Sequence, residues 1–93
     1  MKKSDKQLKT LVVVKWRDAH ADFSNGWLDE SDIEPEPFIV TSVGISITGV
    51  KPQHVSVCQS YADGLVDHVI HIPDDMVEEI TVIGTMEVGE THG

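Results

Sequence analysis

The stretch "PFIVTSVGISITGV", residues 37–50, decides the fold of this chain. Apolar residues recur at every second position, and small or polar residues fill most of the positions between them, with Thr41 and Val40 as the exceptions. The alternating apolar positions are Ile39, Val43, Ile45 and Ile47. Period two is the spacing at which the side chains of a β-strand share one face, so the stretch predicts a long strand. Gly44 in mid-strand predicts a bulge or a sharp bend that curls the strand toward a barrel.

Four further segments have the composition of β-strands, because Val, Ile and Thr dominate them. They are "KTLVVVKW" (9–16), "HVSVCQSY" (54–61), "GLVDHVIHI" (64–72) and "EEITVIG" (78–84). Turn residues separate these segments. The turn pairs include Gly49 with Pro52 and Asp63 with Gly64. The sequence therefore predicts an antiparallel arrangement of five strands.

One helical turn is expected just before the last strand. Pro73 ends the fourth strand, and Asp74 and Asp75 are acidic residues suited to the start of a short helix. This order of elements resembles SH3-like and Sm-like small barrels, in which a one-turn helix and a final short strand close the sheet. We therefore expect an all-β fold, a small antiparallel five-stranded SH3-like barrel with one helical turn before the last strand.

The domain organisation follows from the length and from the ends of the chain. Ninety-three residues form one domain with one hydrophobic core. We expect a flexible basic arm over 1–8, a single β-barrel domain over 9–84 and a flexible tail over 85–93. The longest predicted connection, 18–36, lies between the first two strands, and such loops commonly carry binding residues.

Charge is distributed unevenly along the chain. Residues 1–17 hold six of the seven basic residues and one acid, a sum of +5, whereas residues 18–93 sum to −14 and give the net charge of −9. So acidic a surface repels phosphate backbones, which excludes duplex nucleic acid as the expected partner. Three interpretations of the acidity remain: solubility, a decoy for a basic protein, or self-association of the basic arm with the acidic face.

The cysteine count and the N-terminus favour a soluble cytoplasmic protein. Cys58 is the single cysteine, so neither an internal disulfide nor a zinc site built from cysteines can form. The apolar run "LVVV" after the basic start is too short for a signal peptide or a membrane span.

A second resemblance rests on three short motifs. They are Trp16, Asp18 and Ala19, then Ser42, Val43 and Gly44, then Ile72 and Pro73. In the order of these motifs the chain is similar to small uncharacterised accessory proteins of tailed bacteriophages. The resemblance implies a phage accessory protein that acts in the host bacterial cytoplasm, and counter-defence is one role it suggests. It implies no catalytic residues.

The residue types that carry catalysis are present without the required spacing. His20 and Asp22 supply two potential metal ligands, too few for a site. His54 and Cys58 lie four residues apart on one strand, about 13 Å, too far for a thiolate pair. No phosphate loop or dinucleotide fingerprint occurs. We expect a protein that is not an enzyme and that takes no metal and no cofactor, and we expect His68 to be a partly buried structural histidine.

Two tryptophans flank the first loop, "WRDAHADFSNGW" (16–27). We expect Trp16 to pack in the barrel. Trp27 either stacks on a flat ligand or forms a subunit contact, or the two tryptophans plug the two ends of the barrel. In the leading hypothesis a homo-oligomer holds a nucleotide-like small molecule at a subunit interface. The ligand-binding residues of that hypothesis are Lys15, Trp16, Arg17, His20, Phe23 and Trp27.

The segment "LDESDIEPE", residues 28–36, contains five acids and offers an alternative site. In this alternative the protein is an acidic inhibitor that binds a basic host protein. The protein-binding residues would be Glu30, Asp32, Glu34 and Glu36. A role as a virion or assembly component is the third hypothesis.

Overall fold

A computed structural model describes residues 7–19 and 27–88 of the chain. They form five β-strands and two 3-10 turns. In chain order these are β1 (Gln7–Asp18), η1 (Glu30–Asp32), β2 (Phe38–Ile47), β3 (His54–Ala62), β4 (Leu65–Pro73), η2 (Asp74–Met76) and β5 (Val77–Val88). The expected all-β class and the helical turn before the last strand are confirmed.

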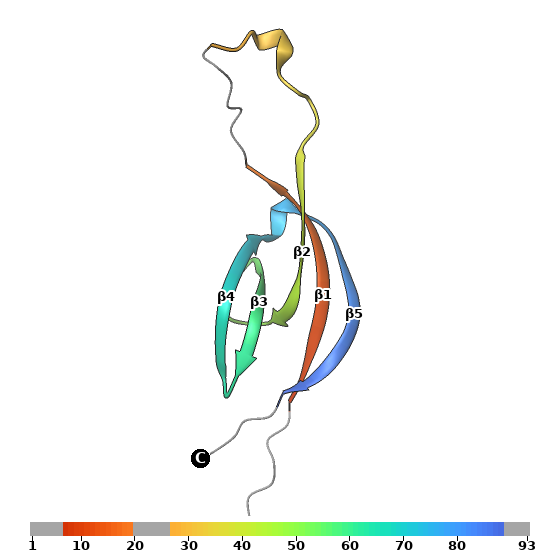
Figure 1. Ribbon diagram of the computed structural model, residues 1–93, viewed down its shortest axis with the longest axis vertical. Helices are drawn as coiled ribbons and strands as arrows, with labels where there is room; N and C mark the ends of the chain where they lie inside the picture. The colour runs from red at the N-terminus through yellow and green to blue at the C-terminus, as the bar shows by residue number, and fades with distance from the viewer. Residues whose placement is uncertain (1–6, 20–26, 89–93) are drawn as a thin grey trace, which may run out of the picture.

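The strands form one antiparallel sheet in the order β4-β3-β2-β1-β5. The sheet is not closed, so the prediction of a closed barrel was wrong. In Figure 1 the β3–β4 hairpin lies on one side of β2, and β1 and β5 lie on the other. β2 pairs with β3 only over Ile45–Ile47, whereas its pairing with β1 extends from Phe38 to Ile45. The sheet therefore opens between β2 and β3, and β4 and β5 remain as its two outer edges.

The hydrophobic core lies on one face of the sheet. Its central residues come from three strands: Val12 and Val14 from β1, Val57 from β3 and Ile72 from β4. Trp16, Val55, Ile70, Met76 and Val77 pack around them. Because successive side chains of a strand point to opposite faces, Val12 and Val14 of β1 lie on the same buried face.

Gly44 has a different role from the one expected. The β1–β2 register runs through Val12↔Gly44 without a shift, so no bulge lies there. A Cβ at this position would lie 2.5 Å from Val57 Cγ1 and 2.6 Å from the Cys58 carbonyl oxygen. Gly44 is thus the point where β3 comes too close to β2 for any side chain.

The bulges lie in the edge strand β5 instead. Leu11 pairs with Gly84 and Val12 with Val82, so Ile83 is an extra residue in the ladder. A second shift lies between Lys15 and Trp16, opposite Glu78. β5 extends to Val88 and β1 begins at Gln7, so strand structure reaches into the segments expected to be tail and arm.

The β3–β4 turn shows how local sequence fixes a hairpin. Asp63 and Gly64 both have positive φ, 51° and 78°, as a tight two-residue hairpin requires, which confirms the predicted Asp-Gly turn. His68 also has a positive φ of 53° and its side chain is exposed, so its expected partial burial was wrong.

No helix in the described part of the chain is long and apolar enough to cross a membrane.

Candidate functional site

The β1–β2 connection projects from one end of the sheet, where its described part, residues 27–37, lies beyond the strands (Figure 1). The 3-10 turn η1 gives this segment local order. Asp29 caps the turn, because its Oδ1 accepts hydrogen bonds from the backbone N–H and the hydroxyl of Ser31, each at 3.1 Å. The Asp32 N–H donates to the Asp29 carbonyl at 2.9 Å. Every residue from 27 to 37 is exposed.

Large apolar side chains are exposed along the same segment. Trp27 is fully exposed, and Leu28 and Ile33 are about half-exposed. Phe38 and Ile39, the first residues of β2, continue the apolar surface. A fully exposed tryptophan leaves its large apolar ring in contact with water. Contiguous exposed apolar residues of this kind mark interaction sites in folded proteins.

Acidic residues are interspersed with the apolar ones along this segment. Glu30, Asp32, Glu34 and Glu36 all have exposed side chains, and none forms an ion pair with another residue that the structure describes. No Lys or Arg occurs from 27 to 38. We name residues 27–38 the acidic–apolar loop. No described residue forms an ion pair with the acidic side chains of this loop.

Of the six residues predicted to bind a nucleotide-like ligand, the neighbouring Lys15, Trp16 and Arg17 do not share one face of β1. Trp16 is half-buried: it packs against the core as expected, and its Nε1 donates a hydrogen bond to Ser42 Oγ at 3.0 Å. Lys15 and Arg17 project from the opposite face of β1, since neighbouring residues of a strand alternate. His20 and Phe23 lie outside the described residues.

The guanidinium of Arg17 is held by its own chain. Its Nε lies 2.5 Å from Glu78 Oε2, and its Nη2 donates to the Asp75 carbonyl at 2.6 Å. These bonds connect β1 to η2 and to the first residues of β5. Arg17 therefore holds the last turn against the sheet, and an anionic ligand would have to displace both contacts.

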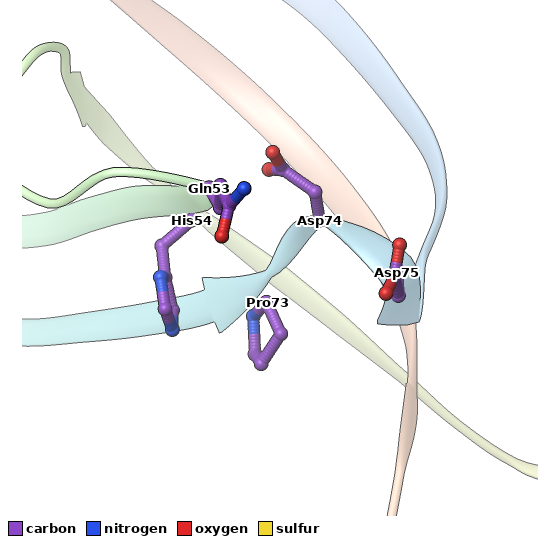
Figure 2. Close-up of a pocket in the computed structure, with 5 residues that line it drawn as sticks. All are labelled: Gln53, His54, Pro73, Asp74 and Asp75. Atoms are coloured by element: carbon purple, nitrogen blue, oxygen red, sulfur yellow. The ribbon is translucent and has the colours of Figure 1, made fainter.

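A polar hollow of about 300 Å³ lies where the β2–β3 connection meets the end of β4. It is lined by Gln53, His54, Pro73, Asp74 and Asp75. The Asp74 N–H donates to the Gln53 carbonyl at 3.0 Å, and this bond links the two segments. Figure 2 shows the His54 ring and the two carboxylates pointing in different directions, so they do not converge on one bound atom.

The imidazole of His54 is oriented by a local contact. Its Nδ1 lies 2.8 Å from the Pro52 carbonyl oxygen, which only accepts, so Nδ1 carries the proton. Among the residues that the structure describes, no three His, Cys, Asp or Glu side chains gather to hold a metal ion.

Sequence reasoning singled out Trp27 but missed the exposed Leu28 and Ile33 beside it, and it missed the polar hollow. The signal for the first was present, because Leu28 and Ile33 interrupt an otherwise acidic stretch. The hollow depends on the contact between Gln53 and Asp74, which lie 21 residues apart in the sequence. No local sequence pattern predicts a contact of that separation.

Comparisons with known proteins give no identification. A scan against protein-family models, a search of curated proteins and a search of solved structures each find no match to this chain.

Proposed function

We propose that this chain is a binding protein without enzymatic activity, and that its acidic–apolar loop contacts a partner protein with a basic surface. The observation that carries the proposal is the full exposure of Trp27 beside a run of acids, none of which is paired within the described chain. Protein interfaces combine an aromatic or apolar centre with a polar rim, and tryptophan is prominent among residues that dominate binding energy.

The charge pattern favours a protein partner with Lys or Arg around an apolar pocket. Five acids within residues 29–36 repel nucleic acids and acidic membrane surfaces. Trp27 would fill the pocket, and the acids would accelerate the encounter and fix its orientation. The nucleotide hypothesis is less favoured, because Arg17 is engaged by Glu78 and Trp16 by Ser42.

The wider setting is also a proposal. The strand order and the 3-10 turn before β5 support a relationship to SH3-like small barrels, here with an open sheet. The resemblance to phage accessory proteins suggests a host protein in the bacterial cytoplasm as the partner.

Two variants with the same net charge test the proposal. The loop variant carries Glu30→Gln, Asp32→Asn, Glu34→Gln and Glu36→Gln. The sheet variant removes four acids elsewhere, by Asp67→Asn, Asp74→Asn, Asp75→Asn and Glu79→Gln. Each variant and Trp27→Ala is immobilised beside the wild type and exposed to host cytoplasmic proteins, and captured proteins are identified by mass spectrometry.

The expected result is a basic protein captured by the wild type and the sheet variant and lost from the loop variant and Trp27→Ala. Capture should weaken as salt is raised, since the acids are solvent-exposed. Circular dichroism of the loop variant should match the wild type, because the loop acids make no contact with the core. Equal capture by all four proteins, or capture of nothing by the wild type, would reject the loop as the contact.

A further inference from the structure

We propose that a hollow on the face of the sheet opposite the core binds a small aliphatic carboxylate. The hollow has a volume of about 330 Å³ and lies where the start of β1 meets the β3–β4 hairpin. In Figure 1 this is the end of the sheet away from the acidic–apolar loop. The proposed ligand site shares no residue with that loop, so it is independent of the partner proposed for the loop.

The wall of the hollow is largely aliphatic. Its aliphatic residues come from β4, from the end of β2 and from the turn after β2: Ile47, Val50, Val66 and Val69. Along β4, Val69 and His71 alternate with Ile70 and Ile72, which pack in the core, so the hollow lies on the opposite face. The three valines are between 37% and 55% exposed. Exposed apolar side chains that line one concave surface are the kind of surface that a ligand covers.

The strained backbone of His68 assembles this wall. Val66 and Val69 are three residues apart, so in a regular strand they would lie on opposite faces. His68 lies between them with a φ of 53°, in the left-handed region that side chains rarely adopt. This turn of the backbone accounts for the presence of both valines in one hollow. Backbone strain is concentrated at functional sites, and here its effect is to complete a binding surface.

A positive charge lies at one side of the hollow. Lys9 is half-buried, and its ammonium nitrogen lies 5.2 Å from the centre of the Tyr61 ring. The ion pairs between described residues do not include Lys9, and none of the described residues that line the hollow is acidic. A cation–π contact compensates a half-buried ammonium only in part, so an anion in the hollow would stabilise it further.

The His71 ring supplies a second polar group. Its Nδ1 lies 2.7 Å from the hydroxyl oxygen of Ser56, which is 2% exposed. This contact orients the ring, so Nε2 is the nitrogen that a ligand can contact. When the Ser56 hydroxyl donates to Nδ1, Nε2 carries the proton and can donate to a carboxylate.

The charge and the wall together select the class of ligand. Among the described residues that line the hollow, Lys9 alone has a fixed positive charge, and the net charge of −9 disfavours a ligand with more than one negative charge. The Tyr61 ring already contacts the ammonium and most of the wall is aliphatic, so an alkyl chain fits better than an aromatic ring. A monocarboxylate with a short or medium alkyl chain meets both conditions.

Titration of the ¹⁵N-labelled full chain with hexanoate, followed by NMR, tests the proposal. Hexanoate should shift the amide signals of Lys9 and of residues 64–71, with a Kd on the order of 1 mM because the hollow is open to solvent. Propanoate should bind about eightfold more weakly, since it lacks three methylenes and each partly buried methylene contributes about twofold. Hexanamide has the same chain without the charge and should bind about tenfold more weakly or worse.

Two pairs of variants locate the contacts. Lys9→Gln should raise the Kd of hexanoate about tenfold, whereas Lys15→Gln, on the same strand but outside the hollow, should leave it unchanged. Val66→Asp places a negative charge in the hollow and should abolish the shifts. Val43→Asp, at an exposed position of β2 outside the hollow, should not. The amide spectrum of each variant also shows whether it is folded.

The comparison of hexanoate with hexanamide uses only the wild type, so it decides the question even if a variant is unfolded. The proposal would be overturned if hexanoate left residues 64–71 unshifted, or if hexanamide bound as tightly as hexanoate. Equal weakening of hexanoate binding by Lys9→Gln and Lys15→Gln would also overturn it.

Discussion

Replacing Gly44 by alanine should destabilise the sheet by about 3 kcal/mol. The added Cβ would lie 2.5 Å from Val57 Cγ1 and 2.6 Å from the Cys58 carbonyl oxygen, where ordinary contacts begin at 3.4 Å. Val57 is buried in the core, and the carbonyl belongs to the backbone of β3, so neither atom can move alone. Relief therefore requires β3 to shift by about 0.9 Å from β2, the difference between 3.4 and 2.5 Å.

The magnitude follows from what that shift disrupts. β2 and β3 pair over only three residues, and the Ile45↔Cys58 pair lies next to the clash. Overpacking of a core costs about 1–3 kcal/mol, and each weakened hydrogen bond of the short ladder adds about 1 kcal/mol. For a domain of this size, a loss of about 3 kcal/mol lowers Tm by about 12–24 °C.

Gly84→Ala is the matched control in β5. No atom lies within 4 Å of a Cβ built there, and Gly84 is not among the residues with positive φ. Its change in unfolding free energy should stay within about 1 kcal/mol, with stabilisation expected because alanine restricts the unfolded chain. Urea unfolding followed by circular dichroism and tryptophan fluorescence measures both variants. The reasoning would be refuted by an unfolding free energy of Gly44→Ala within 1 kcal/mol of that of the wild type. An equal loss of unfolding free energy in Gly84→Ala would also refute it.

Three further predictions concern single side chains. Ser42→Ala removes the acceptor of the Trp16 Nε1–H and should cost about 1–2 kcal/mol in urea unfolding, while Ser31→Ala in the exposed loop should change little. Burial raises the pKa of the Cys58 thiol above its ordinary value of 9.0, and Lys9 opposes this in part. The unfolded thiol therefore ionises first, so the unfolding free energy should fall as pH rises above about 9, with a shallower fall in Cys58→Ala. Gln53 has a φ of 61°, so Gln53→Gly should raise stability by about 0.5–1 kcal/mol in thermal melts, and a gain from Gln53→Ala would contradict that cause.

The strands and their order of appearance were predictable because they depend on local patterns. Period-two alternation located β2, and the Asp63-Gly64 pair located the β3–β4 turn. Acidic residues after Pro73 located η2. Each of these signals is contained within a few neighbouring residues, so a single sequence suffices to find it.

Closure of the sheet was not predictable, because it depends on where a ladder between two strands ends. The β2–β3 ladder ends at Ile45↔Cys58, and the sequence alternation of β2 continues past that point without change. His68 illustrates the same limit: its parity predicts burial, but a positive φ turns the backbone and leaves the ring exposed.

The position of the candidate site was predictable from the sequence, whereas the residues that form it were only partly predictable. The length and acidity of the first connection indicate a projecting loop, and the structure leaves Trp27 fully exposed. Arg17 was assigned to the ligand, yet it contacts Glu78, sixty-one residues later in the chain. Contacts of that sequence separation depend on the β1–β5 register, which no local pattern specifies.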